Sequence, residues 1–224
     1  QPRVPWQVKY LALVLIWGSS FLLMKVGLEA LSAVQISALR ILSGAVVLLA
    51  LLLAGGGRLP TGARVWGHLV VCGFFLGALP FTLFALSETR ISSALAGIGN
   101  AATPIATVLA TLAILPGERA TGRRLVAVGV GFLGVITIMQ PWTATDRPDL
   151  VGFSMALIGG ASYGVGWTYN RRFLSGVDLG GLSQPTATLL TALGLMVPFV
   201  ITWALLQPEG IAAIWAYDTA GAGD

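Results

Sequence analysis

A stripe of polar side chains runs along one apolar stretch of the sequence, residues 91–115. Its members recur at helical spacing and would share one face of a helix; they are Ser93, Asn100, Thr103, Thr107 and Thr111. Pro104 cannot donate to the carbonyl oxygen of Asn100, so the helix should kink there and leave that oxygen free. The pattern predicts contact with a substrate in a central cavity by four residues: Asn100, Thr103, Pro104 and Thr107. The alternative is helix packing, in which threonine hydroxyls bond their own backbone.

Two further segments carry aromatic side chains beside small ones at spacings of three and four residues. One face consists of Trp17, Ser20, Phe21 and Met24, and the other of Tyr163, Gly166, Trp167 and Asn170. Aromatic rings next to small residues suit a mostly apolar pocket with a few polar groups. We therefore expect substrate contact from four of these residues: Trp17, Ser20, Tyr163 and Trp167. Aromatic residues that face lipid or the membrane interface would give the same pattern, so both interpretations stay open.

Arg40 is an ionisable residue within an apolar stretch, about two helical turns from the beginning of that stretch. A charge at the centre of a membrane span costs roughly 2.5–3.5 kcal/mol, so an embedded arginine is expected to have a partner or a function. One interpretation is that the guanidinium faces the cavity and binds a substrate carboxylate through two hydrogen bonds. The other is that the side chain extends outward to the membrane interface.

Acidic residues are absent from the middle of every apolar stretch. Glu29 and Glu88 lie at the ends of such stretches, and the others lie in links or in the tail. A central carboxylate is the usual device for proton-coupled export of cations, so this chemistry is not predicted for these segments. The sequence also lacks H-E-x-x-H, G-x-S-x-G, P-loop and Cys/His metal-binding patterns. We expect no enzyme activity, no cofactor and no metal, and an intramembrane enzyme is the less favoured alternative.

Seven apolar segments that are long enough to cross a bilayer fill most of the 224 residues and must position these side chains. They cover residues 10–28, 34–54, 65–86, 91–115, 125–141, 150–169 and 182–206. Hydrophobic residues make up 56% of the chain and charged residues 10%, and the mean hydropathy is +0.85. A soluble protein would instead show amphipathic helices or alternating strands. The sequence predicts an all-α polytopic membrane protein.

Small residues recur every four positions within residues 150–169, at Gly152, Ala156, Gly160 and Gly164. Such ribbons let helix backbones approach closely in lipid, where the hydrophobic effect does not drive helices together. We expect tight helix packing along this segment.

Basic residues are distributed unevenly between the links. Nine fall on one side, namely Arg3, Lys9, Arg58, Arg64, Arg119, Arg123, Arg124, Arg171 and Arg172, and only Arg90 and Arg147 fall on the other. This asymmetry predicts a cytoplasmic N-terminus in a multi-pass membrane protein. The net charge of +4 is therefore a feature of topology, and we expect no binding of nucleic acid.

The chain also contains a weak internal repeat with a shift of 146 residues, in which Trp17 aligns with Tyr163 and Lys25 with Arg171. The first unit contains five segments. Because five is odd, the second unit would enter the membrane in the opposite orientation, an architecture common among secondary transporters. We predict a five-helix repeat at residues 1–141 and an incomplete second unit of two helices and an outer tail at residues 142–224.

Several short motifs follow one another along the chain. They are Trp17-Gly18-Ser19-Ser20-Phe21 with Lys25-Val26-Gly27-Leu28, then Ala38-Leu39-Arg40, Ala85-Leu86, Ser92 to Ala96, Pro104 and Gly117-Glu118-Arg119. In this order they resemble the EamA-like family of the drug/metabolite transporter superfamily. The resemblance implies ten helices in two five-helix halves that move small molecules across the cytoplasmic membrane. We therefore expect this chain to hold the first seven of ten helices.

These features together predict a secondary transporter of small metabolites or drugs that works by alternating access between inverted repeats. The expected partners are a small-molecule substrate and the lipid bilayer, and a homodimer is compatible with the sequence. The alternative is a fragment or membrane scaffold that does not transport. The residues do not determine the substrate, the direction of transport or the coupling ion.

Overall fold

The computed structural model describes residues 5–115, 121–139 and 149–216, apart from some side chains of the helix at 122–139. Regular structure in these ranges is helical throughout. The helices are α1 (Trp6–Gly27), α2 (Ala33–Ala54), α3 (Ala63–Gly73), α4 (Leu79–Glu88), α5 (Ser93–Asn100), α6 (Thr103–Ile114), α7 (Gly122–Met139), α8 (Leu150–Phe173) and α9 (Ser183–Leu205), with a π-helical turn η1 (Phe74–Ala78) and a 3₁₀ helix η2 (Gly210–Ile214). The motif at residues 117–119 and Arg147 lie outside the described residues.

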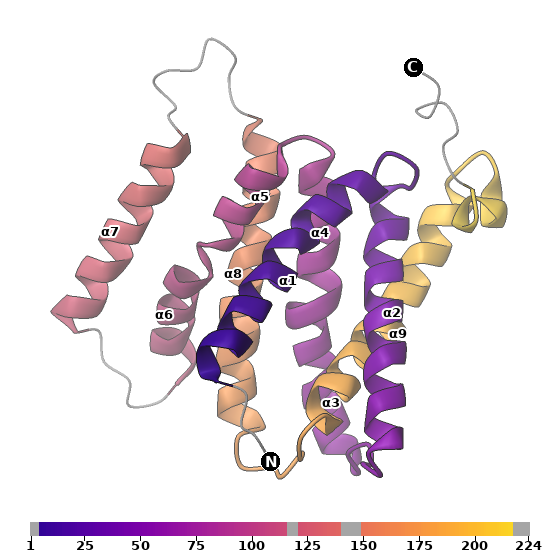
Figure 1. Ribbon diagram of the computed structural model, residues 1–224, viewed down its shortest axis with the longest axis horizontal. Helices are drawn as coiled ribbons and strands as arrows, with labels where there is room; N and C mark the ends of the chain where they lie inside the picture. The colour runs from indigo at the N-terminus through magenta and orange to yellow at the C-terminus, as the bar shows by residue number, and fades with distance from the viewer. Residues whose placement is uncertain (1–4, 116–120, 140–148, 217–224) are drawn as a thin grey trace.

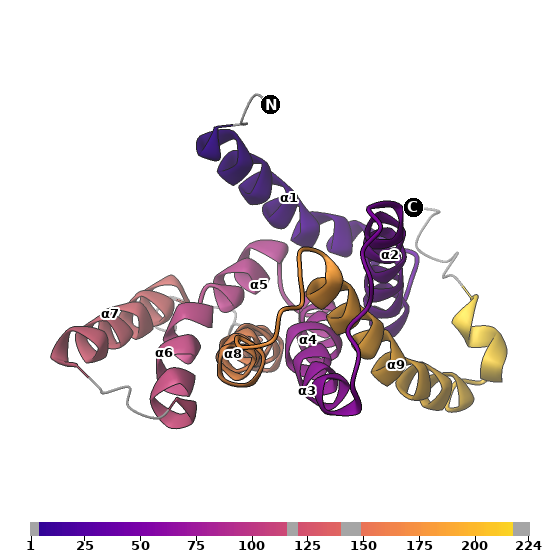
Figure 2. The same ribbon diagram turned by 90° about the horizontal axis from the view of Figure 1, so that it is seen from below.

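The helices stand side by side, and their connecting loops gather at two ends of the bundle (Figure 1). We call the end that holds loops 55–62 and 174–182 the basic end; it is the lower end in Figure 1. The hydroxyl of Ser183 donates to the carbonyl oxygen of Arg58 at 2.8 Å and joins these two loops. α8 packs against α4, α5 and α6, and α9 packs against α2 and α3. α7 lies at one edge, against α6 (Figure 2).

Six of the described helical segments are long and apolar enough to cross a membrane. They are Trp6–Gly27, Ala33–Ala54, Ala63–Glu88, Ser93–Ile114, Leu150–Phe173 and Ser183–Leu205. Each matches one expected segment, and the remaining expectation, residues 125–141, corresponds to the 18-residue helix α7. Large apolar side chains such as Leu11, Leu15 and Ile16 are exposed on the outside. The prediction of an all-α polytopic membrane protein is confirmed.

The predicted interruption at Pro104 is present. α5 ends at Asn100, α6 begins at Thr103, and Pro104 occupies the first turn of α6, where its missing N–H removes no helical hydrogen bond. The carbonyl oxygen of Asn100 accepts the Thr103 hydroxyl at 2.7 Å instead. The proline therefore divides one membrane span into two short helices that meet at an angle (Figure 1).

The ribbon of small residues on α8 forms the predicted packing surface. A β-carbon added at Gly160 would lie 2.7 Å from the carbonyl oxygen of Gly99. One added at Gly164 would lie 2.5 Å from the backbone nitrogen of Thr107. Both neighbours are backbone atoms of the α5–α6 span, so α8 contacts that span backbone to backbone. Only glycine allows so close an approach at these two positions.

Short polar side chains cap the helices at the end opposite the basic end. Ser32 and Gln35 form a reciprocal capping box at the start of α2. The Gln35 amide also donates to the carbonyl oxygens of Ala213 and Ala216, at 3.1 Å and 2.6 Å, which ties the segment after α9 to α2. Asp149 caps α8 by accepting the Gly152 N–H at 2.7 Å.

The Asp149 cap gives the stability of the protein a predictable pH dependence. The Gly152 N–H, followed by the Arg90 guanidinium at 3.1 Å, stabilises the carboxylate, so the pKa of Asp149 lies below its ordinary value. A lowered folded-state pKa means that the stabilisation is complete above the ordinary pKa near 4 and is lost as the pH falls through the folded value. Asp149→Asn should therefore lower the unfolding temperature in detergent at pH 7, and the difference from wild type should shrink toward pH 3. Unfolding curves with a constant separation across this range would contradict the argument.

Candidate functional site

Arg40 points into the bundle between three helices. Its guanidinium carbon lies 4.4 Å from the centre of the Phe81 ring on α4, a cation–π distance. One guanidinium nitrogen lies 3.8 Å from the sulfur of Met24 on α1. The side chain is half-buried and lies against these neighbours. Of the two interpretations of Arg40, the geometry favours the one in which the guanidinium faces the interior.

A chain of aromatic rings continues from this point across α1, α4 and α8. Trp17 meets Tyr163 edge to face with ring centres 6.5 Å apart, and Tyr163 lies 6.0 Å from Phe84. Phe84 in turn contacts Phe21 edge to face at 5.3 Å. Tyr163 is buried, whereas Trp17 is 48% exposed and forms the open end of the chain. The two aromatic faces predicted from the sequence therefore meet at Trp17 and Tyr163.

A cation beside aromatic rings can bind an anionic group and a flat apolar group at the same time. Arg40 lies over Phe81, Phe81 is one helical turn before Phe84 on α4, and the Phe84 ring lies 6.0 Å from the ring of Tyr163. Ser20 is half-buried on α1 between Trp17 and Met24. A guanidinium binds a carboxylate or phosphate, and aromatic edges and faces pack against flat apolar groups. The cluster of Trp17, Ser20, Arg40, Phe81 and Tyr163, which we call the Arg40 cluster, suits a small molecule that carries both.

The polar stripe of the α5–α6 span lies against α8 rather than with the Arg40 cluster. The Thr103 hydroxyl shares its one proton between the carbonyl oxygens of Asn100 and Gly160, at 2.7 Å and 2.9 Å, and the Thr107 hydroxyl donates to the carbonyl oxygen of Thr103 at 2.8 Å. Pro104 is exposed and faces α7 with Ile105 across a cavity of about 380 Å³. These are the contacts of helix packing that the sequence left as the alternative. Substrate binding by Asn100, Thr103, Pro104 and Thr107 stays a prediction.

Trp167 is placed away from the other aromatic residues. It is 55% exposed on the outside of α8, on the surface expected to meet lipid. Asn170, one turn further along, accepts the amide of Gln184 at 2.7 Å and links α8 to α9. The structure thus brings Trp17 into ring contact with Tyr163 and places Arg40 beside Phe81 and Met24, and Ser20 lies one turn after Trp17 on α1. Substrate binding by Trp17, Ser20, Arg40, Tyr163 and Trp167 stays a prediction.

Glu88 is the residue that the sequence did not indicate. It lies at the end of α4, as expected, yet it is completely buried. The Lys25 ammonium donates to the main-chain carbonyl oxygen of Glu88 at 2.5 Å, and the carboxylate interacts electrostatically with Lys25 and Arg40. The burial arises because α1 and α5 lie over the end of α4. No local pattern predicts that contact, because it depends on residues far apart in the sequence.

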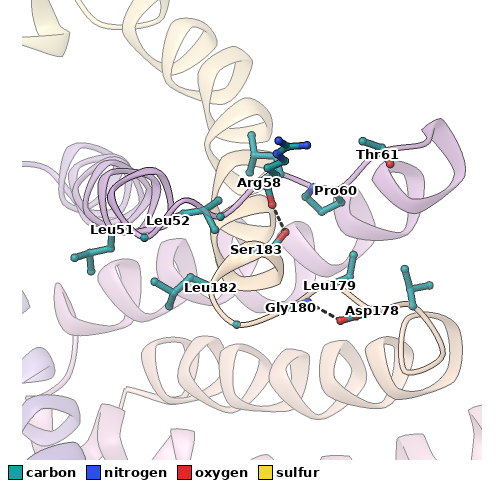
Figure 3. A pocket seen from close by; sticks show the side chains of 15 residues that line it. Leu51, Leu52, Arg58, Pro60, Thr61, Asp178, Leu179, Gly180, Leu182 and Ser183 are labelled. Atoms are coloured by element: carbon teal, nitrogen blue, oxygen red, sulfur yellow. Dashed lines mark hydrogen bonds between the residues drawn. The ribbon is translucent and has the colours of Figure 1, made fainter.

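A pocket at the basic end, lined by both polar and apolar residues, is separate from the Arg40 cluster. It has a volume of about 630 Å³ and lies between residues 51–61, at the end of α2 and in the loop that follows, and residues 177–183. Figure 3 shows Ser183, at the start of α9, bonded to the backbone of Arg58, and Asp178 on the loop that precedes α9. The loops after α2 and before α9 therefore line one pocket at one end of the bundle. His68 lies at the same end, where it bonds the Tyr169 hydroxyl at 2.8 Å and stacks on Phe173.

Comparison with known proteins agrees with this architecture. The uncharacterized inner membrane transporter YedA of Escherichia coli strain K12 is 25% identical over 206 residues, which are 91% of this chain and 66% of that protein. An uncharacterized transporter of Archaeoglobus fulgidus is 28% identical over 165 residues, 72% of this chain and 56% of that protein. Protein PagO of Salmonella typhimurium is 26% identical over 146 residues, 64% of this chain and 47% of that protein. The chain thus spans less than two thirds of the length of these relatives.

No solved structure gives a significant match to the chain. The profile of the EamA-like transporter family matches residues 5–140, more than half of the chain and the whole of α1 to α7. The matched region contains Trp17, Ser20 and Arg40. Together with the six membrane-spanning helical segments, this match establishes that the chain is a multi-pass membrane protein that belongs to the EamA-like transporter family.

Proposed function

We propose that the chain forms the greater part of a secondary transporter in the cytoplasmic membrane, and that it moves small metabolites or drugs by alternating access between inverted repeats. The observation that carries the proposal is the Arg40 cluster, in which a cation and aromatic rings from α1, α2, α4 and α8 converge inside the bundle. A substrate with one anionic group and a flat apolar part fits this chemistry.

The course of the chain supports an inverted arrangement. α1 begins at the basic end, whereas α8, its partner in the 146-residue repeat, ends there (Figure 1). The two helices therefore run in opposite directions, as the aligned helices of an inverted repeat must. Trp17 and Tyr163, which align in that repeat, contact each other. Residues 1–141 and 142–224 are the proposed first and second units, and their interface would hold the substrate.

The orientation in the membrane follows from the basic end. Arg58, Arg64, Arg171 and Arg172 lie in or next to the loops at that end, which we place in the cytoplasm together with the N-terminus. The Arg90–Asp149 ion pair then lies on the outer side. Exchange of substrate between the two sides would require the Arg40 cluster to open alternately toward each end.

Flux into proteoliposomes tests the proposed function. The panel consists of radiolabelled aromatic carboxylates, aromatic and aliphatic amino acids, and aromatic cationic drugs, each measured by counterflow against its unlabelled form. We expect saturable counterflow of panel members that combine an anionic group with an aromatic part, because only these use both Arg40 and the rings. Liposomes without protein give the background. Counterflow no faster than that background for every panel member would reject the proposal.

A further inference from the structure

Glu88 has a buried carboxylate whose oxygens lack well-formed hydrogen bonds to the described residues. Its exposed fraction is 0%, and neither carboxylate oxygen has a hydrogen bond of good distance and angle from the described residues, although the Ser93 hydroxyl lies near them. The hydroxyl of the adjacent Ser87 is also fully buried and has no partner among those residues. Buried polar atoms in proteins are nearly always hydrogen-bonded, so exceptions point to a function. An unsatisfied ionisable group within a membrane span is a strong case of this kind.

The groups that face Glu88 come from each helix packed around it. α1 contributes the Lys25 ammonium, which is bound to main-chain carbonyl oxygens of Glu88 and Ile91 rather than to the carboxylate. α2 contributes Arg40, whose guanidinium lies 4.4 Å from the centre of the Phe81 ring, two helical turns before Glu88 on α4. α5 contributes the Ser93 hydroxyl, which lies near the carboxylate and donates to the carbonyl oxygen of Phe21 at 3.4 Å. On the α8 side, the Tyr163 ring lies 6.0 Å from Phe84, which is one helical turn before Glu88 on α4.

These surroundings restrict what the carboxylate can bind. The positive charges of Lys25 and Arg40 oppose a metal cation, and the negative charge of the carboxylate itself opposes a second anion. A proton is compatible with the site, because it removes the buried negative charge and leaves an O–H group that can donate a hydrogen bond. Glu88 is also the last residue of α4, next to the exposed Thr89, so protons have a short route to it from that end of the bundle.

We propose that Glu88 is a proton-binding site of the transport cycle, and that proton binding at Glu88 is coupled through Arg40 to binding of a substrate anion. The proposal rests on the proposed function. One proton moves from water to the carboxylate at one side of the membrane and returns to water at the other side. An anion bound at Arg40 cancels part of the positive charge that stabilises the Glu88 carboxylate, so a bound anion makes protonation more favourable. Coupling between two sites is reciprocal, so protonation of Glu88 also strengthens binding of the anion at Arg40.

Because anion binding and proton binding favour each other, the protein would act as a symporter of a proton and an anion. Substrate and proton bind best together and therefore cross together. Such a cycle is electrically neutral for a monovalent anion, and a difference of about one pH unit across the membrane can sustain about a tenfold accumulation of substrate. The driving force comes from the proton gradient, and no metal or cofactor takes part in the step.

Infrared titration tests the proton site without any need for transport. The protein is prepared with ¹³C-labelled glutamate, and the band of protonated glutamic acid is followed against pH in wild type, in Glu88→Gln and in the control Glu29→Gln. Glu29 is exposed near the same end of the bundle. A buried-acid band that titrates in wild type and in the control but is lost in Glu88→Gln supports the proposal. A spectrum of Glu88→Gln that equals wild type at every pH overturns it.

Flux measurements test the coupling. In wild type, a gradient of about one pH unit, acid outside, should drive about a tenfold accumulation of the best panel substrate inside the liposomes. Glu88→Gln should abolish that accumulation while counterflow, which needs no net proton movement, is retained. Retained counterflow also shows that the variant is folded; should the variant not fold, Glu88→Asp is used, and its gradient response should be retained at a shifted pH. Accumulation by Glu88→Gln equal to wild type would refute the coupling, whereas absence of any counterflow in wild type would refute the transport proposal instead.

Discussion

Arg40→Ala is expected to lower the flux of an anionic substrate by about 10- to 100-fold, because a hydrogen bond to a charged group contributes roughly 1.5–3 kcal/mol. In the structure the guanidinium is held inside the bundle by the Phe81 ring and the Met24 sulfur. Removal of the side chain leaves those neighbours in place and takes away the only cation of the Arg40 cluster. The measurement is the initial rate of counterflow in proteoliposomes at equal protein content.

Two control variants separate binding from membrane insertion. Arg40→Lys keeps the charge but loses the planar two-pronged donor, so it should restore only part of the flux. Arg90→Ala removes an arginine of the exposed Arg90–Asp149 pair and should leave the flux close to wild type, because a surface ion pair contributes little. Normal flux in Arg40→Ala at a normal membrane level would remove Arg40 from the binding site.

Gly164→Ala is expected to destabilise the protein by about 1–3 kcal/mol, a typical effect of overpacking. The added β-carbon would lie 2.5 Å from the backbone nitrogen of Thr107 and 2.7 Å from the carbonyl carbon of Ala106. Backbone atoms cannot rotate away as a side chain can, so α6 and α8 must separate along their contact. Thermal unfolding in detergent, followed by loss of the monodisperse peak in size-exclusion chromatography, measures the effect.

Gly194→Ala is the matched control for this substitution. Gly194 lies inside the long helix α9, and a β-carbon there meets no atom within 4 Å. Alanine favours the helix over glycine by about 0.5–1 kcal/mol, so this variant should be as stable as wild type or more stable. Equal unfolding temperatures for Gly164→Ala and Gly194→Ala would show that the α6–α8 contact is not as close as described.

The helices could be predicted from the sequence because each depends on local properties. Apolar length determines a membrane span, and the absence of an N–H in Pro104 determines where the fourth span divides. The repeat of small residues along α8 similarly predicted a close contact, which the structure confirms at Gly160 and Gly164. These features need no knowledge of the neighbouring helix.

The candidate site could be predicted only in part, because the sequence indicates which side chains share a helix face but not which faces meet. Trp17 and Tyr163 were each placed on an aromatic face, and the packing of α1 and α4 against α8 brings them together. Thr103 and Thr107 showed an equally regular polar face, yet that face lies against α8 and its hydroxyls bond backbone carbonyls. Helical spacing is the same in both cases, so spacing alone cannot separate a binding face from a packing face.

The sequence by itself determined the membrane class, the helical segments and the resemblance to the family, because hydrophobic length, charge placement and motif order are properties of the chain alone. The tertiary structure decided the surroundings of the ionisable groups. Arg40 turns inward because Phe81 and Met24 lie beside it, and Glu88 is buried because α1 and α5 cover the end of α4. The energy of a charge depends on the atoms within a few ångströms of it. Those atoms come from helices that are remote in the sequence, so only the folded chain fixes them.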